Sequence, residues 1–156
     1  MIRSNMATKP KKPNYIIYTD GASRGNPGDA SLGVVICKGD GTVMKSYGER
    51  LGIATNNDAE YAAIVYGLKK LKALIGSDAS GTSHVEVRMD SQLAQRQLTH
   101  EYRITEERLF APFIAIWNLQ IDFGSVHFVH IPREKNHMAD ALANQALDAP
   151  AQGKLI

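Results

Sequence analysis

Four acidic residues stand where predicted strands end or predicted helices begin. They are Asp20, Glu60, Asp90 and Asp140. In open α/β sheets, sites form beyond the strand ends, where helices begin, so these carboxylates could meet there. Because like charges oppose joint ionisation, such a cluster needs a cation, and oxygen-only ligands favour Mg²⁺ or Mn²⁺. Two such ions ~4 Å apart can activate a water and stabilise the leaving oxygen of a phosphodiester.

Each acid taken alone also has a structural interpretation. Asp20 precedes a glycine and could belong to a turn. Glu60 follows Asn57 by three residues and could close a capping box. Asp90 could cap the helix that follows it, and Asp140 could interact with a helix dipole. The catalytic hypothesis therefore depends on the four acids as a set.

Hydrophobic patterning predicts one α/β domain that positions these acids. We expect strands at 15–19, 31–38, 43–51, 84–89 and 125–131, and helices at 55–76, 91–98, 106–120 and 136–149. The first three strands should form an antiparallel meander. The order βββαβααβα then predicts a mixed sheet with helices on its faces. In the third helix, Phe110, Phe113, Ile114 and Trp117 are predicted to form a buried face.

Composition fits a single globular domain with a basic N-terminal segment. The chain has 156 residues, of which 44% are hydrophobic and 22% charged, and a net charge of +2. We divide it into a flexible basic leader at 1–14, a domain at 15–149 and a tail at 150–156. The leader has four basic residues and no acid, so it could contact phosphates; a solvated leader without a partner is the alternative.

Cysteine usage and hydropathy restrict the location of the protein. The one cysteine, Cys37, excludes an internal disulfide and a cysteine-ligated zinc cluster. It also favours a reducing compartment, so we expect a cytoplasmic protein. No apolar run is long enough to span a bilayer, and we expect no membrane partner.

Four motifs together resemble the ribonuclease H type 1 family. They are TDGASRGNPG, TNNDAEYAAI, MDSQLAQ and NHMADALAN, in the order and spacing of that family. The resemblance implies a five-stranded mixed sheet flanked by helices. It also implies cleavage of the RNA strand of RNA–DNA hybrids, which leaves a 3′-hydroxyl and a 5′-phosphate. The catalytic metal ligands would be Asp20, Glu60, Asp90 and Asp140, holding two Mg²⁺ ions with Mn²⁺ as a possible substitute. We expect a monomer, since no protein partner is implied.

The resemblance also implies a set of substrate-binding residues. That set is Gly21, Ser23, Asn26, Asn56, Asn57 and Gln92. We expect the glycines at 21, 25 and 28 to let backbone approach a nucleic-acid strand without Cβ obstruction. Contacts in the minor groove can test for 2′-hydroxyls on one strand and their absence on the other. Asn56 and Asn57 could also cap the helix.

Two features depart from the best-known bacterial pattern. The span 99–117 contains only Arg103 and Arg108 as basic residues, so the basic protrusion found in many members is expected to be absent. The chain resembles the protrusion-less branch of the family. Before the last acid, many members carry a loop histidine, whereas protrusion-less members that resemble this chain carry an arginine.

We assign the role of that histidine to Arg133, which lies seven residues before Asp140. A guanidinium cannot move protons near neutral pH, but it can hold a phosphate in a bidentate grip. His130 is expected to have a structural role in the last strand. His137 is expected to cap the last helix or lie on the surface.

Two other functions share this fold. One is a nucleic-acid-binding module without turnover, which the presence of all four acids argues against. The other is a different nuclease of the superfamily, such as a resolvase or an integrase. The Asn-rich motif and the run Asp90-Ser91-Gln92 argue against that reading.

Overall fold

The computed structural model describes residues 12–149. The predicted tail at 150–156 and most of the predicted leader lie outside the described residues. Asn14, which we assigned to the leader, is bonded to the domain. Its backbone N–H donates to the His84 carbonyl at 2.7 Å, and its own carbonyl accepts from the Gly39 N–H at 2.8 Å.

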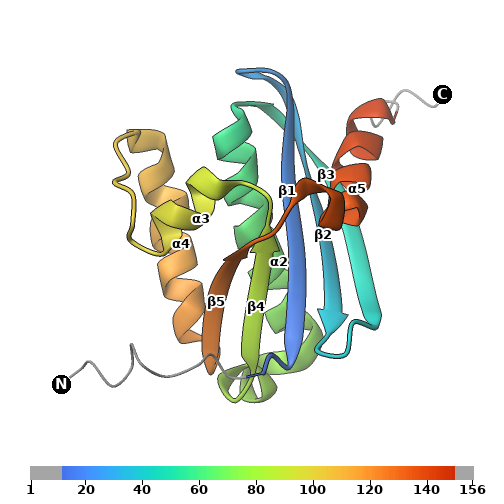
Figure 1. The fold of residues 1–156 in the computed structure, drawn as a ribbon, viewed down its shortest axis with the longest axis vertical. Helices are drawn as coiled ribbons and strands as arrows, with labels where there is room; N and C mark the ends of the chain where they lie inside the picture. Colours follow the sequence, from blue (N-terminus) through green and yellow to red (C-terminus); the bar gives the residue numbers. More distant parts are fainter. Residues whose placement is uncertain (1–11, 150–156) are drawn as a thin grey trace.

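A five-stranded mixed sheet forms the centre of the domain, as predicted (Figure 1). Its strands are β1 (Tyr15–Gly25), β2 (Gly28–Lys38), β3 (Val43–Ala54), β4 (His84–Met89) and β5 (Ser125–His130). They lie in the order β3-β2-β1-β4-β5. The first three strands pair antiparallel, and β4 and β5 extend the sheet in parallel. The sheet therefore consists of a meander joined to two crossover strands.

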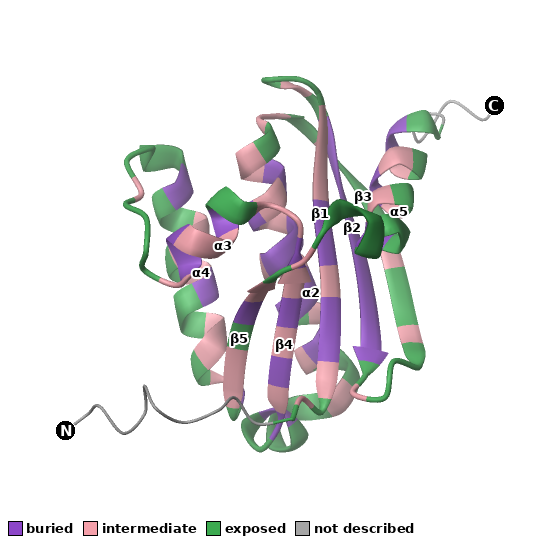
Figure 2. Cartoon of the chain, viewed as in Figure 1, coloured by how far each residue is buried: buried purple, intermediate pink, exposed green. Residues whose placement is uncertain are grey.

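Helices cover both faces of the sheet. They are α2 (Asn56–Gly81), α3 (Gln92–Leu98), α4 (Phe110–Ile121) and α5 (His137–Asp148), with short 3₁₀ turns η1 (Glu107–Leu109) and η2 (Arg133–Lys135). Alternate residues of a strand face opposite sides. Ile17 therefore joins the main core beside α2, whereas Ile16 joins a smaller cluster that includes Leu142 of α5. Buried residues lie along β1, β2 and β4 and in α2, which packs against the sheet (Figure 2).

The glycine-rich segment after Asp20 is not a loop, contrary to our expectation. β1 continues through it to Gly25, and β2 begins at Gly28 rather than at residue 31. The two strands remain paired along their whole length, from Tyr15 opposite Lys38 to Gly25 opposite Gly28. Hydrogen bonding to a neighbouring strand thus outweighs the low strand preference of glycine.

Helix α2 begins with a different cap from the one we expected. Thr55 is the N-cap, and its side chain accepts a hydrogen bond from the Asp58 N–H while the Asp58 carboxylate accepts one from the Thr55 N–H. Glu60 therefore does not close a capping box, and its carboxylate is available to the site. Gly76, at a φ of +87°, kinks the helix where we expected it to end, and a further helical stretch extends to Gly81.

Helix α4 exposes most of the residues that we predicted to be its core face. Trp117 is 47% exposed, and Phe110 and Ile114 are about half exposed; only Phe113 packs partly against the core. Ile116 is the buried residue of this helix. Because the helix is apolar on several sides and carries no charge, periodicity alone could not identify the side that meets α2.

Within residues 12–149, no helix is long and apolar enough to cross a membrane.

Candidate active site

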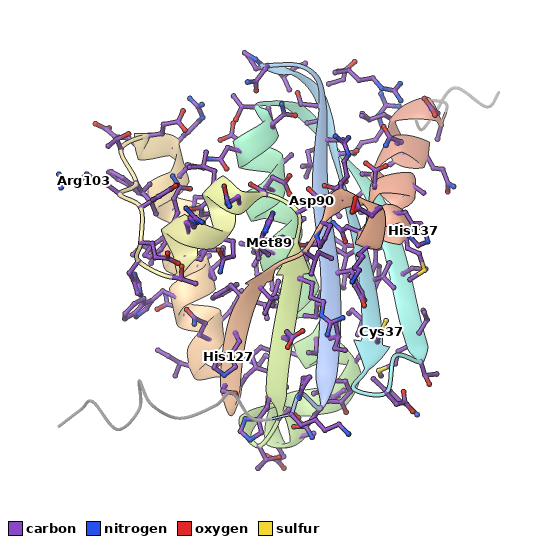
Figure 3. All side chains as sticks on the ribbon, in the orientation of Figure 1. Cys37, Met89, Asp90, Arg103, His127 and His137 are labelled. Atoms are coloured by element: carbon purple, nitrogen blue, oxygen red, sulfur yellow. The ribbon has the colours of Figure 1, made fainter. Side chains whose placement is uncertain are left out.

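Three of the four predicted acids converge where β4 ends, beside the middle of β1. Asp20 lies in β1, Glu60 in the first turns of α2, and Asp90 directly after β4. One carboxylate oxygen from each lies within 4.8 Å of the other two. β1 and β4 are parallel neighbours in which Thr19 pairs with Met89, so Asp20 and Asp90, the residues that follow them, lie close together. Asp90 lies beyond the end of β4, beside the segment that leads into α5 (Figure 3).

Gly21 brings Glu60 close to the strands. A Cβ at this position would lie 2.4 Å from the Ala59 carbonyl carbon and from the Glu60 nitrogen. The Gly21 N–H donates to Oε1 of Glu60 at 3.1 Å. A glycine is therefore required for the start of α2 to pack against β1, and the backbone of β1 then orients the carboxylate.

The structure gives these glycines a structural requirement that we did not expect, because a Cβ at Gly21 or Gly28 would meet the backbone of the protein itself. The expected approach of a nucleic-acid strand to this backbone stays a prediction. A Cβ on Gly28 would lie 2.1 Å from the Arg24 carbonyl oxygen. Gly25 has a φ of +109°, which suits the hairpin between β1 and β2.

The electrostatics of the cluster favour a bound cation. Burial, followed by the charge of Asp90 and the proximity of Asp140, raises the pKa of Asp20 to about 8. Burial and the charges of Asp20 and Asp90 raise the pKa of Glu60 well above its usual value, although the Gly21 N–H opposes this. A divalent ion would allow these carboxylates to ionise together at neutral pH. The donor set consists of carboxylate oxygens, as Mg²⁺ and Mn²⁺ prefer.

Asp140, the fourth acid, reaches the cluster from α5. It lies in the first turn of that helix and is close enough to Asp20 to raise its pKa. The Asn144 side chain donates to the Asp140 carbonyl at 3.0 Å and to Oδ1 at 3.3 Å. Asp140 is therefore oriented from within its own helix and stands at the margin of the three-acid group.

Arg133 is a predicted site residue that is open to solvent. Its side chain is 82% exposed, and its guanidinium lies 4.0 Å from Oδ1 of Asp140. Its charge lowers the pKa values of Asp20 and Glu60, although burial and the neighbouring acids outweigh it. His130 is exposed at the end of β5, and His137 is exposed with Nδ1 at 3.3 Å from the Glu134 carbonyl oxygen. Neither histidine has a resolved contact with the acids.

The predicted substrate-binding residues lie in three segments: β1 with the turn after it, the start of α2, and the start of α3. Ser23 donates to the Ala54 carbonyl at 2.8 Å, and Oδ1 of Asn26 accepts from the Asn56 N–H at 2.9 Å. Gln92 is exposed at the start of α3. Nδ2 of Asn57 is buried and has no partner among the described residues. This last group, three residues before Glu60 in the chain, is therefore an available donor within the described part of the chain.

A cavity of about 610 Å³ lies next to this region. Asn26, Asn56 and Asn57 line it together with Arg108. Arg108, which we noted only as one of two basic residues in its span, donates through Nε to Asp58 at 2.9 Å and through a terminal nitrogen to Glu106 at 2.6 Å. Arg103, the other basic residue of the span, projects from the loop before η1, away from Asp90 (Figure 3).

Sequence reasoning missed one buried residue of the site. Asn136 is 1% exposed and donates through Nδ2 to the Thr19 carbonyl at 2.9 Å and to Asp90 at 3.1 Å. Its only signal in the sequence was its place in the motif that contains Asp140. An asparagine directly before a helix is usually read as a cap.

Comparison with known proteins places this geometry in a family. The reverse transcriptase-like family matches residues 18–146. Ribonuclease HI of Halobacterium salinarum is 41% identical over 131 residues, which are 84% of this chain and 63% of that protein. Ribonuclease H of Caldicellulosiruptor saccharolyticus is 32% identical over 130 residues, which are 83% of this chain and 88% of that protein.

Solved structures agree with these relatives. The crystal structure of LC11-RNase H1 in complex with RNA/DNA hybrid is 42% identical and has a TM-score of 0.81, with 86% of this chain and 96% of that chain covered. The chain spans less than two thirds of the H. salinarum protein, and only 36% of a bifunctional protein of Mycobacterium tuberculosis that is 36% identical to it.

Proposed function

The chain belongs to the ribonuclease H family, and from this we propose that it hydrolyses the RNA strand of RNA–DNA hybrids. The products would carry a 3′-hydroxyl and a 5′-phosphate. The observation that carries the proposal is the convergence of Asp20, Glu60 and Asp90 within 4.8 Å, with Asp140 beside them. The hybrid bound to LC11-RNase H1, at 42% identity, supports the choice of substrate.

Asp20, Glu60, Asp90 and Asp140 would hold two divalent ions. We propose Mg²⁺ as the resident ion and Mn²⁺ as a substitute, because the donors are hard oxygens and no thiolate is near. When bound, two such ions lower the pKa of a nucleophilic water and neutralise charge at the leaving oxygen. The closeness of four like charges, buried at Asp20, is what the ions would offset.

The other groups of the site orient these carboxylates and the scissile strand. The Gly21 N–H fixes Glu60, and the Asn144 side chain fixes Asp140. Arg133, exposed and 4.0 Å from Asp140, is suited to hold a phosphate of the RNA strand through two parallel N–H donors. Its role would be electrostatic, since arginine keeps its proton at neutral pH.

The strand to be cut would be selected by polar groups around the acids. We propose that Gly21, Ser23, Asn26, Asn56, Asn57 and Gln92 contact sugars and base edges of the hybrid. The unpartnered donor of Asn57 supports this, because a hydroxyl or base oxygen could satisfy it. Recognition of 2′-hydroxyls would distinguish the RNA strand from the DNA strand.

We further propose that residues 15–149 act as one domain, in a monomeric cytoplasmic protein. The basic residues of 1–14 would contact phosphates outside the catalytic site. Such contacts release counterions, so binding by a chain that begins at residue 15 should depend less steeply on salt concentration. An unchanged salt slope would leave these residues without that role.

A cleavage assay tests the proposed function. A labelled RNA–DNA hybrid, duplex DNA and duplex RNA would each be incubated with the protein in Mg²⁺, Mn²⁺ or EDTA. We expect cutting of the hybrid's RNA strand alone, with none in EDTA. Glu60→Gln should reduce the rate by at least about a hundredfold, whereas the exposed control Glu107→Gln should stay within about twofold of the parent. Hybrid binding without cleavage in either metal would instead favour a non-catalytic module.

A further inference from the structure

We propose that Asn136 is the positioning residue that holds the carboxylates of the site in register for metal binding. The inference rests on the proposed two-ion function and goes beyond the four acids. Asn136 is not one of the acids and has no charge. It acts through hydrogen bonds to the Asp90 side chain, to the backbone of Asp140 and to the residue before Asp20.

One amide group ties the strands that carry Asp20 and Asp90. Nδ2 of Asn136 donates to the carbonyl of Thr19, the residue before Asp20, at 2.9 Å. It also donates to Oδ2 of Asp90 at 3.1 Å. Both partners are acceptors, which fixes the orientation of the amide, since its oxygen could not face them. A single nitrogen therefore links the Asp90 carboxylate to the backbone that leads into Asp20.

The backbone of the same residue begins the helix that carries the fourth acid. The Asn136 carbonyl accepts from the Asp140 N–H at 3.1 Å, and its N–H donates to the Arg133 carbonyl at 2.9 Å. Asn136 thus joins η2, which carries Arg133, to α5, which carries Asp140. A shift of this residue would move both groups relative to the strands.

The orientation of the Asn136 side chain leaves two local hydrogen bonds unmade. Asparagine is a favoured N-cap, yet the Asn136 side chain makes no cap hydrogen bond to α5 because it is directed at the strands. Its Oδ1 is buried with no partner among residues 12–149. A residue whose only role was to start the helix would make the cap hydrogen bond and would have a partner for its side-chain oxygen. The absence of both bonds is therefore consistent with a site that requires the two Nδ2 contacts.

A residue that only attached α5 to the sheet should affect stability but not ion binding when it is replaced. Ser31 is such a residue and serves as the comparison. Ser31 is fully buried, and its hydroxyl donates to the Ala143 carbonyl of α5 at 2.6 Å, so it links the same helix to β2 without touching an acid. Ser31→Ala loosens the attachment of α5. Asn136→Ala loosens it and also frees Asp90.

The test measures ion binding and kinetics separately. Mn²⁺ affinity would be measured by calorimetry without substrate, and kcat and KM with a hybrid. Groups that orient metal ligands typically account for 10–100-fold in affinity or activity. We expect Asn136→Ala to weaken Mn²⁺ binding and lower kcat by about tenfold or more, with KM within about twofold of the parent. Ser31→Ala should leave both ion affinity and kcat within about twofold of the parent.

Equal ion affinities in Asn136→Ala and Ser31→Ala would overturn the inference. If Asn136→Ala does not fold, the parent protein supplies the readout: its Asn136 side-chain amide protons should exchange slowly and their NMR signals should shift when Mg²⁺ is added. Signals that do not respond to saturating Mg²⁺ would also overturn it. A parent protein that neither binds ions nor cleaves hybrid would refute the proposed function itself, so the two failures are distinguishable.

Discussion

Replacing Asp20 by asparagine should abolish cleavage and yet stabilise the metal-free protein. Burial and the nearby Asp90 and Asp140 raise the pKa of Asp20 to about 8 from a reference value of 3.8. The folded protein therefore keeps a proton on Asp20 that the unfolded chain releases above its own pKa. Stability conferred by that proton falls as the pH rises from about 4 to about 8, then levels off. An asparagine side chain cannot ionise, so the variant escapes this penalty.

The size of the effect follows from the same interval. It covers about four pH units, and at about 1.4 kcal/mol per unit the penalty at pH 8 has a ceiling of about 6 kcal/mol. Entry of water into the cluster lowers that ceiling. We expect Asp20→Asn to increase the free energy of unfolding by about 2–4 kcal/mol at pH 8 and by less than about 1 kcal/mol at pH 4.

Urea unfolding in EDTA at several pH values measures this difference. Addition of Mg²⁺ should narrow it, because the ions stabilise the folded parent in proportion to their affinity and bind the variant less well. A variant that is less stable than the parent at pH 8 would refute the reasoning. So would two proteins whose stabilities follow the same pH dependence between pH 4 and pH 8.

Three further substitutions probe the cap, the exposed arginine and the face of α4. Burial raises the pKa of Asp58, but hydrogen bonds from Thr55 in the capping box and from Arg108 outweigh burial, so the pKa lies below its usual value. The ionised carboxylate therefore stabilises the fold at pH values above the pKa of Asp58 in the unfolded chain. Asp58→Asn should therefore lower the free energy of unfolding by about 1 kcal/mol at pH 7, and this difference from the parent should disappear in acid. A difference that grows in acid would contradict this reasoning. Arg133→Ala should slow single-turnover cleavage by about tenfold or more with little change in hybrid affinity. Weaker hybrid binding with an unchanged cleavage rate would instead show that Arg133 serves in substrate binding. In thermal unfolding, the free energy of unfolding of Ile114→Ala should stay within about 0.5 kcal/mol of the parent, whereas that of Ile116→Ala should be lower by about 2–5 kcal/mol. A larger loss in Ile114→Ala than in Ile116→Ala would contradict the observed orientation of α4.

The order of strands and helices along the chain, and the positions of the acids next to them, could be read from the sequence because both depend on local signals. Asp20 and Asp90 directly follow apolar strand segments, and parallel pairing of those segments brings them together. Glu60 was harder to interpret. Its spacing from Asn57 fitted a capping box, but Thr55 and Asp58 form that box nearer the start of the helix.

Other features depend on partners distant in the chain, which local patterns do not reveal. The segment 21–25 reads as a glycine loop, but β2 pairs with it residue by residue and makes it strand. Helix α4 is apolar on several sides, so its packing against other elements, mainly α2, decides that Ile116 is buried and Trp117 is exposed. The role of Asn136 has no local signal in the sequence, since its partners lie 46 and 117 residues away.

Anomalous diffraction from a crystal soaked in Mn²⁺ tests the metal centre most directly. We predict two peaks ~4 Å apart, bounded by the oxygens of Asp20, Glu60, Asp90 and Asp140. Their appearance only with Mn²⁺, and their loss in Glu60→Gln, would tie them to these ligands. A saturated crystal in which no peak lies among the four carboxylates would contradict two-ion catalysis at this site.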